Sequence, residues 1–67
     1  MKEYTVRYSD GHGSMMVMAA DGTPAKYTEA EALTKAGELA MKYKTYAKIY
    51  KGRLLVHAIT VHTPSSN

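Results

Sequence analysis

Apolar and polar residues recur with a helical period only between residues 28 and 43. Thr28 stands at the N-cap position and Glu31 follows three residues later, the capping-box pattern in which each side chain accepts a backbone hydrogen bond from the other. The residues expected on the buried side are small or apolar: Ala32, Leu33, Ala36, Leu39, Ala40 and Tyr43. Two Glu–Lys pairs on the opposite side have the i,i+4 spacing of helical ion pairs: Glu31–Lys35 and Glu38–Lys42. A narrow stripe made mostly of alanine predicts a helix that lies close to a flat sheet.

Residues 3–9 alternate between apolar and polar side chains, which predicts a strand with one buried face. Residues 10–13 form a glycine-rich turn, and residues 14–20 are expected to return as the second strand. This turn places three cross-strand pairs on one face: Tyr8–Met15, Val6–Val17 and Tyr4–Ala19. The opposite face then carries Thr5, Arg7, Ser9, Met16 and Met18.

A second hairpin is predicted after the helix, with strands at residues 46–51 and 54–62 joined by a type II′ turn at Gly52-Arg53. Setting Lys51 opposite Leu54 pairs Tyr50 with Leu55 and Tyr46 with Ile59. One face then holds Ala47, Ile49, Leu54, Val56 and Ala58. The other holds Tyr46, Lys48, Tyr50, Leu55, His57, Ile59 and Val61.

These elements predict an α+β fold of ββαββ type, a four-stranded antiparallel sheet with one helix packed on one face. Strand order 2-1-3-4 is favoured, and order 1-2-4-3 would be equally antiparallel. The expected domain spans residues 1–63, with a frayed tail at residues 64–67 that begins at Pro64.

Composition limits the class of protein. The 67 residues include no cysteine, so disulfides and thiolate metal sites are excluded. No apolar run reaches the roughly 20 residues of a membrane span, and no signal peptide precedes the first strand, so we expect a cytoplasmic protein. Leu, Ile, Val and Phe are few, but six Tyr and five Met supply further apolar surface. A core this small contributes ~3–5 kcal/mol, so dimerisation or a partner is expected to matter for stability.

The polar residues form no catalytic or metal-binding set. His57 and His62 are five residues apart on one strand and point to opposite faces, while His12 lies in a distant turn. Asp10 and Asp21 each precede a turn glycine, and the helical glutamates suit a helix start or an ion pair. We therefore expect no enzymatic activity, no metal and no cofactor.

The second hairpin has two apolar faces and only one helix to cover them. If the alanine stripe covers Ala47 and Ile49, the tyrosine side is exposed; the alternative is that the tyrosine side is the core, which would bury Lys48 and His57 together. The exposed assignment predicts a partner-binding face because Tyr, Arg and Met are typical of interfaces. Its residues are Arg7, Met16, Met18, Tyr46, Lys48, Tyr50, Leu55, His57 and Ile59. The last strand carries no Pro and no Asp, Glu, Lys or Arg, so at a sheet edge it would be a candidate for strand addition.

In build the chain resembles small proteins encoded by phages and mobile elements, the group that includes anti-CRISPR inhibitors. The resemblance rests on a short hairpin strand, an Ala/Glu helix start and a Tyr/Lys strand at residues 4–11 (YTVRYSDG), 28–33 (TEAEAL) and 46–52 (YAKIYKG). It implies an inhibitor or adaptor that binds a host protein, such as a defence nucleoprotein complex, and assigns no residue a role. The alternative is nucleic-acid binding, favoured by the net charge of +3 and by lysines that flank Tyr46 and Tyr50. A homodimer through the exposed face is compatible with either function.

Overall fold

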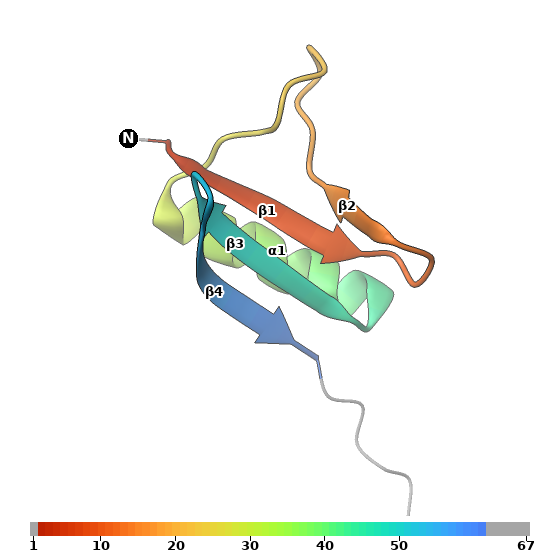
Figure 1. Ribbon diagram of the computed structural model, residues 1–67. Helices are drawn as coiled ribbons and strands as arrows, with labels where there is room; N and C mark the ends of the chain where they lie inside the picture. The colour runs from red at the N-terminus through yellow and green to blue at the C-terminus, as the bar shows by residue number, and fades with distance from the viewer. Residues whose placement is uncertain (1, 62–67) are drawn as a thin grey trace, which may run out of the picture.

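The computed structural model describes residues 2–61 and has the predicted ββαββ layout (Figure 1). Its elements are β1 (Tyr4–Ser9), β2 (Ser14–Met16), α1 (Glu29–Tyr43), β3 (Tyr46–Lys51) and β4 (Leu54–Thr60). The strands form one antiparallel sheet in the order β2-β1-β3-β4, which confirms the favoured topology. The expected tail at residues 64–67, like His62, lies outside the described residues.

The first hairpin keeps its predicted register but is shorter than expected. Tyr8 pairs with Met15, and the Val17 N–H donates to the Val6 carbonyl oxygen at 2.9 Å. The prediction of a strand that continues to residue 20 is wrong, because Tyr4 forms its bridge with Tyr27 instead of Ala19. Residues 17–25 fold back on themselves in a narrow loop, where the Ala25 N–H donates to the Val17 carbonyl at 3.0 Å. The Asp21-Gly22 turn closes this loop and ends the second strand early.

Helix α1 begins as the capping box predicts. The Glu31 N–H donates to the Thr28 hydroxyl at 3.2 Å, and the Thr28 N–H donates to the Glu31 carboxylate at 3.0 Å. Lys44 ends the helix in the left-handed region at φ 52°, and its N–H donates to the Ala40 carbonyl. Within the described chain, the expected Glu31–Lys35 and Glu38–Lys42 ion pairs are absent. The Glu31 carboxylate lies instead 3.7 Å from Lys2 Nζ, since the cap has already turned it toward the helix start.

The second hairpin contains an irregularity that differs from the predicted register. Tyr50 pairs with Leu55 as expected, but the next pair is Ile49 with His57, so Val56 is an extra residue in β4. A bulge of this kind shifts every later pair by one position. Tyr46 consequently pairs with Thr60, and the predicted Tyr46–Ile59 pair is wrong.

The core lies between α1 and the two central strands. Its fully buried residues are mostly small: Val6, Ala32, Ala36, Ala40, Ala47 and Ile49. Leu39 packs against this cluster from the helix, and the Tyr8 and Tyr43 rings stack at 5.4 Å between centroids. Leu33 was expected in the same stripe but is 38% exposed. The sheet face opposite α1 is covered by no element of the described chain (Figure 1).

The helix start should be sensitive to acid through Glu31. The pKa of this carboxyl lies below its usual range, because it accepts the Thr28 N–H and lies near the Lys2 ammonium. A carboxyl with a lowered folded-state pKa stabilises the fold above its unfolded-state pKa and loses that contribution as the pH falls through the folded-state pKa. We therefore expect the melting temperature to fall below about pH 4.3, the usual pKa of an unfolded glutamate.

A Glu31→Gln variant supplies the control for this acid transition. Glutamine can still occupy the capping box but cannot gain a proton, so its melting temperature should change less over the same interval. Thermal unfolding monitored by circular dichroism checks both proteins. If the melting temperatures of the two proteins fall equally in acid, Glu31 is not the cause of the transition.

Candidate interaction face

The sheet face opposite α1 is defined by the residues that alternate with the core. Val6, Ala47 and Ile49 point at the helix, so the neighbouring Arg7, Lys48 and Tyr50 point away from it. Cross-strand partners share a face, which gives two adjacent rows across the sheet. One row contains Met16, Arg7, Lys48 and Ala58, and the other contains Thr5, Tyr50 and Leu55. We call these residues, with the Tyr46–Thr60 pair, the open face.

Six of the nine predicted site residues lie on this open face: Arg7, Met16, Tyr46, Lys48, Tyr50 and Leu55. Between Tyr46 and the bulge, the tyrosine side of the second hairpin is therefore the uncovered side. The alternative in which the tyrosine side forms the core is wrong for these residues. Tyr46 and Tyr50 are half-buried, while Leu55 is 46% exposed. Ala58 and Thr60 also belong to the open face, although Ala58 was predicted on the other face and neither was a predicted site residue.

His57 and Ile59 were assigned to the wrong face. Ile59 pairs with the buried Ala47 and packs against the core, and Val61 packs there too. His57 Nε2 lies 3.0 Å from Glu29 Oε2 on the helix. The bulge at Val56 is the physical cause, because one extra residue reverses the direction of every side chain that follows it.

Met18 also lies outside the open face as defined by the paired strands. It follows the end of β2 and forms an isolated bridge with Pro24, within the loop formed by residues 17–25. Its side chain is exposed. The early end of the second strand separates it from the row that contains Met16.

The charge of the open face is positive. Arg7 and Lys48 are direct cross-strand partners, an arrangement that is destabilising for two like charges. None of the six carboxylate residues of the chain occurs in a strand, so none lies among the paired residues of this face. Lys48 Nζ lies 5.3 Å from the centre of the Tyr46 ring, which places its ammonium over an aromatic surface.

Thr5 shows how the larger side chains lie across this face. It is only 6% exposed although it points away from the helix, so neighbouring side chains cover it. Tyr50 is its direct cross-strand partner. Tyr50 is itself half-buried, so this end of the open face is partly shielded by its own side chains.

The turn carboxylates have structural partners. The Asp10 carboxylate accepts the His12 N–H at 2.8 Å and the Gly13 N–H at 3.0 Å, which holds its pKa below the usual range. Hydrogen bonds from the Thr23 hydroxyl and N–H likewise lower the pKa of Asp21. Within residues 2–61, no three His, Asp or Glu side chains are grouped as metal ligands.

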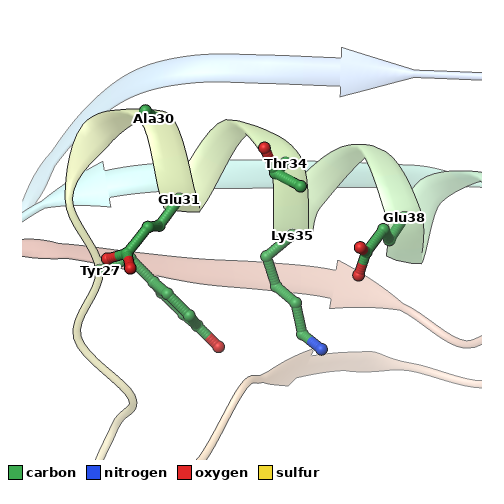
Figure 2. Close-up of a pocket in the computed structure, with 6 residues that line it drawn as sticks. All are labelled: Tyr27, Ala30, Glu31, Thr34, Lys35 and Glu38. Atoms are coloured by element: carbon green, nitrogen blue, oxygen red, sulfur yellow. The ribbon is translucent and has the colours of Figure 1, made fainter.

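A hollow lies on the other side of the molecule, along the charged flank of α1 (Figure 2). It is lined by Tyr27, Ala30, Glu31, Thr34, Lys35 and Glu38. The Glu31 and Lys35 side chains point from the helix toward β1, while β4 runs along the opposite side of the helix. The hollow is shallow and open to solvent, and Glu31 is already engaged in the helix cap. We therefore place the candidate site on the open face.

Strand β4 lies at an edge of the sheet. An edge position is what the predicted strand addition requires. The Val61 N–H donates to the Thr45 carbonyl at 3.0 Å, and backbone groups alternate along an antiparallel strand. The N–H groups of Ala58 and Thr60 consequently point away from β3. The bulge at Val56 limits the regular part of this edge, since bulges twist an edge away from further pairing.

No helix among the described residues is both long enough and apolar enough to cross a lipid bilayer. Comparisons of the chain with known protein families, with curated proteins and with solved structures gave no match.

Proposed function

We propose that this chain is a small, non-enzymatic protein-binding module of the cytoplasm, an inhibitor or adaptor that binds an acidic protein surface through its open face. The observation that carries the proposal is the pairing of Arg7 with Lys48 on an uncovered sheet face. Placing two cations opposite each other weakens the free domain. A partner that presents carboxylates to both would relieve this repulsion.

The tyrosines supply the apolar part of the proposed interface. Tyr46 and Tyr50 flank Lys48 along β3, and Leu55 extends the surface next to Tyr50. Protein–protein interfaces commonly combine aromatic anchors with Arg in their buried centre. Tyr50 is already half-buried in the free domain, so less side-chain freedom is left for it to lose when a partner docks.

We extend the proposal to a phage-encoded inhibitor of a host defence complex, on the resemblance in build described above. A cationic open face suits an acidic subunit of such a complex.

Direct nucleic-acid binding is the alternative, and the same Arg7–Lys48 pair favours it. Two cations next to two tyrosine rings can contact phosphates while the rings stack on bases. Such binding must weaken steeply with salt because counterions are released. Titration of short single- and double-stranded oligonucleotides at two salt concentrations tests it, and no affinity at low salt removes this alternative.

Photo-crosslinking tests the protein-binding proposal directly. A photoreactive amino acid replaces Tyr50, and a matched variant carries it at Lys42, which is exposed on α1. In a bacterial lysate we expect one protein adduct from position 50 that survives nuclease and disappears when Arg7→Glu is added. The same adduct from position 42, or adducts only with nucleic acid, would contradict the proposal.

Lys48→Glu gives a prediction in which stability and binding change in opposite directions. Replacing the repulsive Arg7–Lys48 pair with an attractive one should stabilise the free domain by about 0.2–1 kcal/mol. Binding to an acidic partner or to oligonucleotides should be lost. Urea denaturation and the crosslinking assay measure the two effects. Reduced stability with intact binding would mean that Lys48 is only a structural residue.

A further inference from the structure

One flank of α1 carries two exposed apolar side chains, Leu33 and Met41, with Gly37 between them. Glu29, Leu33, Gly37 and Met41 follow at intervals of four residues, so they form one row along the helix. Glu29 contacts His57, which places the start of this row beside β4. The next two large residues of the row are exposed, Leu33 by 38% and Met41 by 71%. We call Leu33, Gly37 and Met41 the helix flank.

Neither the backbone conformation nor the packing of the folded chain requires a glycine at position 37. Its φ is not positive, and a Cβ atom built on it would meet nothing within 4 Å. Glycine in the middle of a helix is also the poorest helix former after proline. An alanine would therefore fit and strengthen the helix. A glycine at such a position allows the backbone of another segment to approach closely.

The spacing of the flank is symmetric about Gly37. Leu33 lies four residues before Gly37, and Met41 lies four residues after it. If a two-fold axis passes through Gly37, two antiparallel copies of α1 cross there. Each Leu33 then contacts Met41 of the other copy, which is the self-complementary arrangement that a symmetric dimer requires.

The charges at the helix ends fit the same arrangement. Glu29 lies at the start of α1 and Lys44 at its end, and both are exposed. Antiparallel crossing at Gly37 brings Glu29 of one copy near Lys44 of the other and aligns the helix dipoles favourably. Glu31 and Lys35 point toward β1 (Figure 2), on the side of the helix away from β4.

The small core supplies the energetic reason for association. Among the described residues, Ile49 and Val6 are the largest fully buried side chains, while Val56 and Ile59 of β4 pack against the core but remain partly exposed. A second helix lying along α1 would cover this surface. We propose that the chain forms a two-fold homodimer through α1, centred on Gly37, which leaves the open face free for a separate partner.

The test is sedimentation equilibrium of the full chain over a wide concentration range. The wild type should show twice the mass of one chain, decreasing on dilution. Gly37→Ala should raise the dissociation constant by about tenfold or more, because an added methyl group separates closely packed backbones. The same variant should melt at a higher temperature than the wild type at concentrations where both are monomeric.

Met41→Lys tests the flank with a matched charge control. It should abolish the dimer, whereas Glu38→Gln, which changes the net charge equally on the other flank, should not. A wild type that stays monomeric at all concentrations overturns the proposal. An unchanged dimer dissociation constant in Gly37→Ala also overturns it. The same holds if Lys48→Glu abolishes the dimer and Met41→Lys does not, because such a dimer would use the open face.

Discussion

Replacing Ile49 with alanine is expected to leave the chain largely unfolded at room temperature. Ile49 is completely buried on the central strand β3, where it pairs with Val6 on one side and His57 on the other. Truncating a buried isoleucine to alanine costs ~2–5 kcal/mol. A core of this size supplies only ~3–5 kcal/mol, so the variant loses most or all of its stability. Circular dichroism and urea denaturation measure the loss.

Leu54→Ala is the matched control for Ile49→Ala. Leu54 lies in the same hairpin but is 65% exposed, and truncation of an exposed residue changes stability by less than about 0.5 kcal/mol. If both variants unfold at the same urea concentration as the wild type, the centre of the core does not lie at the α1–β3 contact.

Replacing Tyr50 with alanine is expected to cause the largest loss of partner binding. Tyr50 lies on the open face between Thr5 and Leu55, in the row next to the one that contains Lys48. Truncating an aromatic anchor of an interface costs ~2 kcal/mol or more, roughly a thirtyfold loss of affinity. The measurement is a titration of the partner captured by crosslinking, with Tyr50→Phe expected to keep most of the affinity.

Tyr43→Ala separates binding from stability in this experiment. The Tyr43 ring stacks on Tyr8 on the helix side of the sheet, so its loss should lower the melting temperature. Binding by the folded fraction should remain at the wild-type level. If Tyr43→Ala and Tyr50→Ala weaken binding equally, the open face is not the binding surface.

The features that the sequence predicted correctly depend on short-range chemistry. Thr28 and Glu31 cap the helix within one turn, and Gly52 adopts the positive φ of 63° that the first position of a type II′ turn requires. The first hairpin register follows from its own turn in the same way. Each depends on residues a few positions apart, which is why the sequence alone was sufficient.

The errors arise where a local irregularity changes a longer pattern. Alternation in residues 54–61 looks regular, yet the bulge at Val56 moves His57 and Ile59 to the helix side. No Gly marks the position of the bulge, so it could not be predicted from the residues of this strand. Leu33 was predicted on the buried side of the helix, but only the alanines of that side are fully buried and Leu33 is 38% exposed. Gly37 could have indicated the exposed flank from the sequence, because a glycine in the middle of a helix usually has a packing or functional role.

The position of β1 in the middle of the sheet has a consequence for the order of folding. β1 pairs with β3 from Tyr4–Lys51 to Tyr8–Ala47, so partners roughly forty residues apart must meet, and the closure entropy of such a loop opposes their contact. The β3–β4 hairpin and α1 need only local contacts and can nucleate first. We therefore expect β1 to dock last, into a surface that is already assembled, so that its pairing limits the folding rate. Until that step, Val6 is missing from the core and the inner edge of β3 is exposed.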